Sequence, residues 1–144
     1  MATQAPSVAG TMNLLTRLSR VTYRSATPEV LGIKLKELVA LSYLREATKA
    51  TQQKLEKTLM MDANNCVILL NGLEEGGLIE RVRDPEDRRR HIVTMTPLGE
   101  KALKNAERQL ETVEDDVLGN LDTRERDELR ELLAKALEDH SLAI

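Results

Sequence analysis

The 144-residue sequence is poor in aromatic side chains: it has no Trp and no Phe, and Tyr23 and Tyr43 are its only aromatic residues. Its core must therefore consist of Leu, Val, Ile, Ala and Met. The same scarcity argues against single-stranded nucleic acid as the partner, because single strands bind by stacking their bases on aromatic rings. A chain of this length is expected to fold as one domain that is large enough to bury a core.

Cysteine, histidine and long apolar runs are scarce as well. The single cysteine, Cys66, excludes an internal disulfide and fits a reducing cytosol. No apolar run approaches the ~20 residues that a membrane span needs, and no signal-peptide core begins the chain. His91 and His140 lie far apart without metal-ligand spacing, and the sequence has no glycine-rich phosphate loop and no nucleophile elbow. We therefore expect no metal, no cofactor, no membrane partner and no enzymatic activity.

The segment from Met61 to Gly99 is the most informative part of the chain. It has the pattern of a short helix closed by Gly76 and Gly77, followed by two β-type runs, LIERVR and HIVTMT, on either side of an arginine-rich loop. A helix followed by a hairpin with a basic tip is the plan of a winged helix. In that fold the helix lies in the major groove of DNA and the hairpin grips the flanking backbone or minor groove.

The loop of this hairpin places Arg88, Arg89 and Arg90 side by side. Three adjacent cations repel one another, and a polyanionic partner such as double-stranded DNA would stabilise them. The acids that precede them, Asp84 and Asp87 among them, can bind one or two guanidinium groups and orient the rest. The alternative is a solvated polar turn with incidental charges.

The net charge of −3 is unevenly distributed along the chain. Residues 111–144 contain eleven acidic and four basic residues, a formal charge of −7, which leaves +4 for residues 1–110. Such asymmetry would orient the protein on DNA with its acidic end held away. The acidic overall balance is therefore a weak objection to DNA binding.

Hydrophobic periodicity and capping residues predict six helices and one hairpin. Residues 1–10 are expected to be disordered, and a short linker is expected after Thr27-Pro28, which interrupts the first helix. The helices are expected at 11–24, around 35–44, at 51–59 with Thr51 as N-cap, after Asp62, from Thr96-Pro97, and from Asp122 with Glu125 in a capping box. The first and the last two helices carry more apolar surface than a small lobe can cover, including the stripe that begins at Leu98 and continues through Ala102 to Val117. A second copy of the chain is expected to bury it.

The helix after Asp62 divides its residues between two faces. Cys66, Leu69, Leu70 and Leu73 form one apolar stripe that is expected to face the core, and Ala63, Asn64, Asn65 and Ile68 lie near the opposite or N-terminal face. An asparagine can bond bidentately to adenine in the major groove. The alternative is that the two asparagines only form a polar first turn. Gly72, in mid-helix, should cost about 1 kcal/mol relative to Ala and has no functional explanation in the sequence.

With these motifs, the sequence from about Thr11 to Leu137 resembles the MarR family of dimeric winged-helix regulators. The family pattern has a short helix opening with Thr, a recognition helix, a Leu-Glu-x-x-Gly-Leu-Ile turn, an Asp-Arg-Arg wing, and then Pro and Gly. Here it reads TQQKLEKTL and then DANNCVILLNGLEEGGLIERVRDPEDRRRHIVTMTPLG. The resemblance implies a mainly α fold with a small β-hairpin wing, in a single domain over 11–144. Its DNA-binding lobe would span 33–96, and its dimerisation helices 11–26 and 97–140.

The resemblance also implies roles for individual residues. Asp87 falls at the family's supporting wing aspartate and Arg89 at its minor-groove arginine, while Arg88 and Arg90 are further phosphate candidates. Contacts to DNA are also implied for the residues that open the third helix and the recognition helix, namely Thr51, Gln52, Asp62, Ala63, Asn64, Asn65 and Ile68. The chain departs from the family at Asn64 and Asn65, where many members have Ser or Thr, and at Ile68, where many have a basic residue. The expected function is a homodimeric regulator of a pseudo-palindromic operator, and family habit suggests a repressor.

The regulatory input is less readable. Many members of the family bind phenolic or carboxylate effectors between the DNA-binding lobe and the dimerisation helices. Arg17, Arg20 and Arg24, with Tyr23 or Tyr43, could recognise an aromatic acid, or they could be surface charges and ordinary packing. Cys66 could sense oxidants, although its place on the core stripe favours a small hydrophobic role. A protein–protein adaptor that uses a winged helix without DNA is a further alternative.

Overall fold

The computed structural model describes residues 8–140. Over this range the chain forms seven helices and three strands. Their bounds are α1 Val8–Ser25, α2 Pro28–Leu31, α3 Leu35–Ala47, β1 Lys49–Thr51, α4 Gln52–Thr58, α5 Ala63–Glu75, β2 Ile79–Arg83, β3 His91–Met95, α6 Pro97–Val117 and α7 Thr123–Ala136. The mainly helical fold with a small β-hairpin wing is confirmed.

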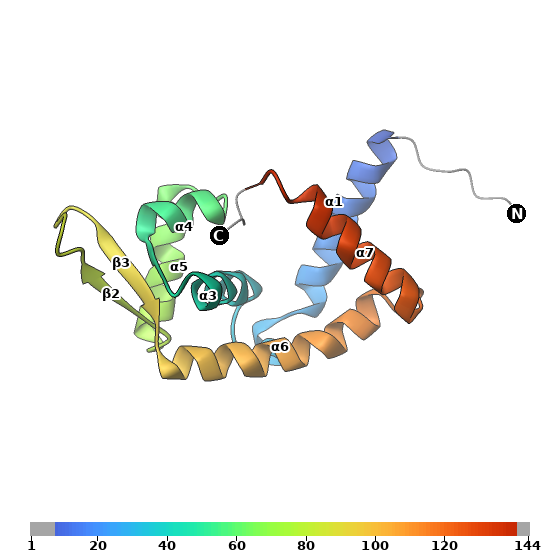
Figure 1. Ribbon diagram of the computed structural model, residues 1–144. Helices are drawn as coiled ribbons and strands as arrows, with labels where there is room; N and C mark the ends of the chain where they lie inside the picture. Colours follow the sequence, from blue (N-terminus) through green and yellow to red (C-terminus); the bar gives the residue numbers. More distant parts are fainter. Residues whose placement is uncertain (1–7, 141–144) are drawn as a thin grey trace, which may run out of the picture.

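Two regions are joined by α6 (Figure 1). The lobe contains α2 to α5, the three strands and the first half of α6, and the arm contains α1, α7 and the rest of α6. The core lies in the lobe, where the fully buried large side chains include Leu31, Leu41, Leu44, Leu55, Leu70, Leu73, Ile79 and Leu103. In the arm, no described side chain of α1 or α7 is buried.

The hairpin belongs to a three-stranded antiparallel sheet with the order β1-β3-β2. Val93 is the centre of this sheet, since it pairs with Ala50 of β1 on one side and Arg81 of β2 on the other, and its side chain is fully buried. The hairpin was predicted, but β1 was not. With three residues, β1 is too short to show an alternating pattern.

The predicted N-caps are confirmed at four helices. Thr51, Asp62, Thr96 and Asp122 each accept a hydrogen bond from the backbone N–H three residues later, and Asp122 forms the predicted capping box with Glu125. These side chains satisfy backbone donors that no intrahelical partner reaches, which fixes where each helix begins. Four of the seven helix starts could therefore be assigned from the sequence.

Three expectations need correction. The short linker expected after Thr27-Pro28 contains α2, because Thr27 caps a helical turn that begins at Pro28 and ends at Gly32 with φ +84°. Helix α1 begins at Val8, so residues 8–10 are helical where disorder was expected, and residues 1–7 lie outside the described range. In α6, the fully buried Leu103 was not part of the predicted apolar stripe, while Leu98 of that stripe is exposed in the single chain.

Close packing joins α6 to the hairpin at Gly99. A Cβ atom at this position would overlap the backbone carbonyl of Leu78, and Thr96 donates its hydroxyl to the Gly77 carbonyl at 2.6 Å. The hairpin therefore leaves the lobe in a direction that is fixed by the start of α6. Gly72, by contrast, has room for a Cβ atom, which would lie 3.6 Å from a carboxylate oxygen of Glu37.

Candidate nucleic-acid interface

The tip of the hairpin is a closed turn built around Asp84. The Asp84 backbone N–H donates to the Arg90 carbonyl at 2.9 Å, and the Arg90 N–H donates to the Asp87 carbonyl at 3.0 Å. The Asp84 side chain is almost fully buried and accepts from the Glu86 backbone N–H at 2.9 Å. These bonds give the loop a defined shape instead of a solvated turn.

The three wing arginines differ in how they are held. Arg89 donates through Nε to Asp87 Oδ1 at 3.1 Å, yet its side chain is 91% exposed. Arg90 instead turns inward and donates to the Asp84 carboxylate at 2.9 Å. Arg88 is exposed, and its backbone carbonyl accepts from Arg83 at 2.8 Å. The wing thus presents Arg88 and Arg89 to its surroundings, while Arg90 serves mainly to brace the loop.

Asp87 is the residue that orients Arg89. Its carboxylate accepts from both the side chain and the backbone N–H of Arg89, and these bonds lower the pKa of Asp87 below its usual value. Asp84 has the corresponding role for Arg90, as the sequence analysis allowed for the acids that precede the arginines, although the family resemblance pointed to Asp87 alone. The Asp-Pro pair after a strand was the available indication, because Asp side chains commonly hydrogen-bond the backbone of turns.

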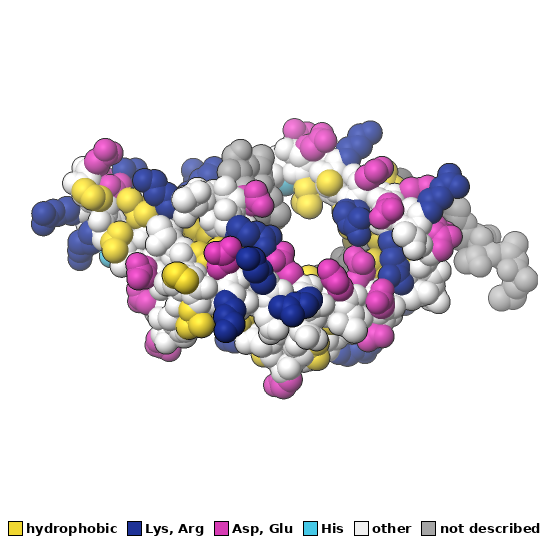
Figure 2. Space-filling view, turned by 60° about the horizontal axis from the view of Figure 1, so that its bottom comes forward, with side chains coloured by type: hydrophobic (Ala, Val, Ile, Leu, Met, Phe, Trp, Pro, Cys, Tyr) yellow, Lys and Arg dark blue, Asp and Glu magenta, His cyan; other side chains and the backbone are white. Residues whose placement is uncertain are grey.

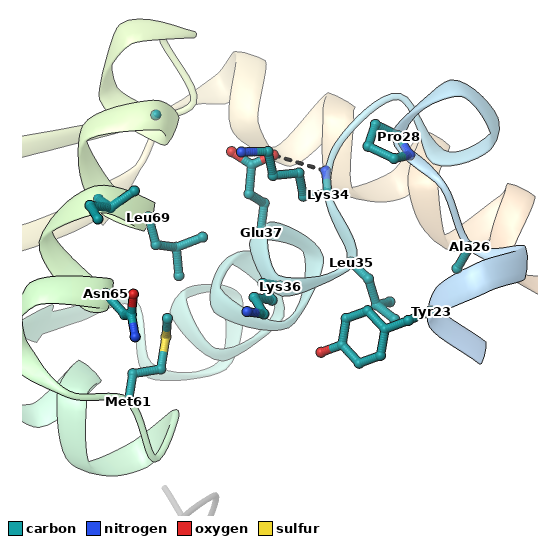
Figure 3. Close-up of a pocket in the computed structure, with 12 residues that line it drawn as sticks. Tyr23, Ala26, Pro28, Lys34, Leu35, Lys36, Glu37, Met61, Asn65 and Leu69 are labelled. Atoms are coloured by element: carbon teal, nitrogen blue, oxygen red, sulfur yellow. Dashed lines mark hydrogen bonds between the residues drawn. The ribbon is translucent and has the colours of Figure 1, made fainter. Parts of the chain in front are cut away.

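The two adjacent asparagines in the first turn of α5 differ in their hydrogen bonding. Asn65 donates its backbone N–H to Asp62 Oδ1 at 2.8 Å and its side-chain Nδ2 to Asp62 Oδ2 at 3.0 Å. In Figure 3 the Asn65 side chain lies beside Met61 and Leu69, on the pocket side of the helix. Asn64 is exposed and has no side-chain hydrogen bond within residues 8–140. The four residues of the expected core stripe are buried as predicted.

The start of α4 lies beside the sheet and carries the other predicted contacts. Thr51 uses its hydroxyl to accept from the Lys54 backbone N–H at 3.1 Å, and Gln52 is half-buried. Lys54 is exposed one turn along the helix and was missed as a candidate cation, although its spacing from the Thr51 cap could have indicated it.

A polar network ties the hairpin to α5. Arg81 of β2 donates to Glu74 Oε1 at 2.9 Å and to Asn71 Oδ1 at 2.6 Å, and its side chain is 19% exposed. The same bonds lower the pKa of Glu74. The angle between the hairpin and α5 therefore depends on a residue outside both predicted contact sets.

A cavity of about 360 Å³ lies where α1 meets the lobe, between α3 and α5 (Figure 3). Its lining includes Tyr23, Lys34, Lys36 and Asn65, and the Lys34 backbone N–H donates to Glu37 at 2.8 Å. The predicted effector set is not brought together here. Tyr43 is buried in the core of the lobe, and the three arginines of α1 (Arg17, Arg20 and Arg24) are exposed outside the lining.

Cys66, on the core-facing side of α5, is fully buried, and burial raises the pKa of its thiol. A protonated, inaccessible thiol is a poor nucleophile, so the arrangement fits the hydrophobic role better than the oxidant-sensing one. Across residues 8–140, no cluster of three metal-ligating side chains occurs, and no helix is long and apolar enough to cross a membrane.

Basic side chains gather at the tip of the hairpin (Figure 2), as the run of arginines in the sequence predicts. In Figure 2 Lys and Arg side chains project from the tip at the left of the view, whereas acidic and basic side chains are interspersed over the remainder. The same view shows an open gap through the molecule between the lobe and the arm. A cationic tip beside an exposed helix N-terminus is the geometry that grips two grooves of a duplex.

Comparisons with known proteins agree with this geometry. A family model described as MarR family matches residues 31–90. The chain is 31% identical over 104 residues to the HTH-type transcriptional regulator BilQ of Clostridium symbiosum, covering 72% of each protein. It is 30% identical over 104 residues to the uncharacterized HTH-type transcriptional regulator YdgJ of Bacillus subtilis, covering 72% of this chain but 63% of YdgJ. A crystal structure of a mutant MarR from E. coli complexed with operator DNA is similar with a TM-score of 0.73 and 25% identity, covering 87% of this chain and 91% of that one.

Proposed function

Because the chain belongs to the MarR family of transcriptional regulators, and not to a family of enzymes, we propose that it is a homodimeric repressor of transcription that binds double-stranded DNA. One observation carries the proposal: Arg89 is held by Asp87 and is still 91% exposed at the tip of the wing. A guanidinium that is oriented but unburied is prepared for a further anionic partner. Its site of action is the nucleoid, in the cytoplasm.

Each copy presents one α5 to the major groove and one wing to the adjacent minor groove. Asn64 and Ile68 are exposed on the outer side of α5, where base edges would meet them. Arg89 enters the minor groove, and Arg88, Thr51, Gln52 and Lys54 contact phosphates. Asp62 and Ala63 begin α5 near the duplex, but Asp62 is engaged as the N-cap.

The second copy covers the arm. Exposed apolar side chains gather on both of its helices, namely Met12, Leu14, Leu15, Leu132, Leu133 and Leu137. Leucines at this density on a solvated helix favour association, because burying each one removes apolar surface from water. Two-fold symmetry then requires a pseudo-palindromic operator with half-site centres about 10 base pairs apart.

The effector is a small amphiphilic anion that binds the cavity beside α1. Lys34 and Lys36 supply the positive charge that the arginines of α1 were expected to supply, and Tyr23 supplies an aromatic wall. Asn65 belongs both to this cavity and to the first turn of α5. A ligand in the cavity therefore contacts the DNA-reading helix directly and can shift it off the operator.

Selection of a binding site from random duplexes, followed by footprinting and light scattering, tests the proposal. We expect a two-fold symmetric footprint, a dimer at micromolar concentration, and affinity that falls steeply with salt. An adaptor that does not act on DNA would yield no enriched sequence, and a monomer would overturn the dimeric arrangement. Aromatic carboxylates should then weaken operator binding, and Lys36→Ala should reduce that effect.

A further inference from the structure

Ile68 is the single large apolar residue of α5 that is exposed, with 58% of its surface accessible. The other large apolar side chains of this helix are buried or half-buried in the lobe. Ile68 lies one turn after Asn64, so the two side chains share one face of the helix. That face is the one that would enter the major groove under the proposed function.

The helix carries no cation that could read guanine. Its sequence, ANNCVILLNGLEE, has no Lys and no Arg, and Arg and Lys are the side chains that pair bidentately with the O6 and N7 atoms of guanine. What it presents instead is one amide and one branched hydrocarbon. An amide suits adenine, and an apolar side chain suits the 5-methyl group of thymine.

The two asparagines do not compete for the adenine. Asn65 is bound to the carboxylate of Asp62 and lies on the pocket side, whereas Asn64 has both its donor and its acceptor available within the described chain. Residues four apart are separated by about 6 Å along a helix, which corresponds to roughly two base-pair steps of DNA. The readings by Asn64 and Ile68 should therefore fall within about two base pairs of each other.

We propose that Ile68 is a specificity-determining residue that recognises the methyl group of a thymine, within about two base pairs of an adenine read by Asn64, in each half-site of the operator. The inference rests on the proposed function, since it requires α5 to lie in the major groove. It makes the operator rich in A·T pairs in the half-sites, which also suits a minor groove narrow enough to attract Arg89.

Replacing single thymines of the selected operator by deoxyuridine tests this contact, because only the 5-methyl group is removed and base pairing is retained. At one thymine of each half-site, the wild-type protein should lose about fourfold in affinity, the value expected for one buried methyl group. The Ile68→Ala variant should bind the thymine and deoxyuridine operators equally. Asn64→Ala should keep the discrimination between thymine and deoxyuridine but lose discrimination at the adenine that Asn64 reads.

Leu98→Ala is the matched control, since Leu98 is also exposed but lies at the start of α6. It should leave the thymine-to-deoxyuridine ratio at the wild-type value. Equal binding of both operators by the wild-type protein, or an unchanged ratio in Ile68→Ala, would overturn the inference while leaving DNA binding intact. Failure to select any operator would overturn the proposed function itself, so the two failures are distinguishable.

Discussion

The lobe and the arm bury their leucines to opposite extents. In the lobe, Leu55, Leu70 and Leu103 are fully buried. In the arm, Leu132 of α7 is 64% exposed and Met12 of α1 is 58% exposed, although both helices have the periodicity of amphipathic helices. The same residue type therefore serves an internal core in one region and an external surface in the other.

This difference indicates which part of the chain is self-sufficient. The lobe has a closed core, a capped start at each of its longest helices and a sheet whose centre is buried, so its fold does not need a partner. Within the arm, α7 is joined to the end of α6 by ion pairs such as Arg126–Asp115, at 2.6 Å, and none of its described side chains is buried. Exposed ion pairs contribute little stability, so the arm is expected to obtain its order from a second copy.

The largest effect should follow from removing α7 from the arm. Truncation after Leu118 deletes α7 and is expected to abolish dimerisation and operator binding together, while circular dichroism still reports a folded lobe. Light scattering and a binding titration measure the two losses. A truncated chain that remains dimeric would show that α7 is not needed to hold the copies together.

A point substitution makes the same test without shortening the chain. Leu132→Asp places a charge on the exposed apolar face of α7 and should convert the dimer to a monomer. Glu131→Gln, at the neighbouring exposed position, is the control and should leave the dimer intact.

Replacing one leucine by alanine in each region should lower stability in two different ways. Leu70→Ala removes a fully buried side chain from α5 and should lower the free energy of unfolding by about 2–5 kcal/mol. Leu133→Ala, in the arm, should lower stability by an amount that depends on protein concentration, because its contact is with another copy. Denaturant titrations at two concentrations tell the effects apart, and a concentration-dependent loss for Leu70→Ala would break the distinction.

The sequence predicted the parts of this molecule whose determinants are local. The caps Asp62 and Thr96 were assigned because a side chain and a nearby backbone N–H suffice to define them. The stripe from Cys66 to Leu73 was assigned because helical spacing alone collects its members on one face. The hairpin followed from two β-type runs around a charged loop.

What sequence reasoning missed depends on distant contacts. β1 exists because Ala50 pairs with Val93, forty-three positions away, and no local pattern encodes that pairing. The distinction between Asn64 and Asn65 depends on which of them faces the cavity beside α1. That Lys34 and Lys36 line this cavity likewise depends on how distant segments pack. Arg90 was expected to face phosphate, but the buried carboxylate of Asp84 draws it inward.

Substituting the charged residues of the wing should change operator binding, whereas substituting charged residues of the arm should not. Arg89→Ala is expected to weaken operator binding strongly at low salt and to reduce the slope of log K against log salt by about one unit. Asp87→Ala raises the net charge, so electrostatics alone predicts tighter binding. We expect weaker binding, because Arg89 loses the carboxylate that orients it. Tighter binding by Asp87→Ala would show that this ion pair has no positioning role.

The lowered pKa of Asp87 determines the pH range over which its carboxylate can orient Arg89. Because Arg89 lowers the pKa of Asp87, the carboxylate is charged and the ion pair is present at all pH values above its usual range. The contribution is lost only as the pH falls through the lowered value. Operator affinity measured between pH 6 and 8 should therefore show no titration from this residue.

The smallest effect should come from comparing two ion-paired arginines, one in each region. Arg81 binds Glu74 and Asn71 and is 19% exposed, whereas Arg130 binds Asp127 at 3.0 Å and is 64% exposed. Arg81→Ala should weaken operator binding a few-fold, because the hairpin loses its fixed angle to α5, and Arg130→Ala should leave it unchanged. The salt slope distinguishes positioning from direct contact: it stays constant if Arg81 only orients the wing, and it falls by about one unit if Arg81 binds a phosphate. Affinity and salt slope measured together would thus show whether Arg81 only holds the wing at a fixed angle to α5, or whether it is itself part of the DNA-binding surface.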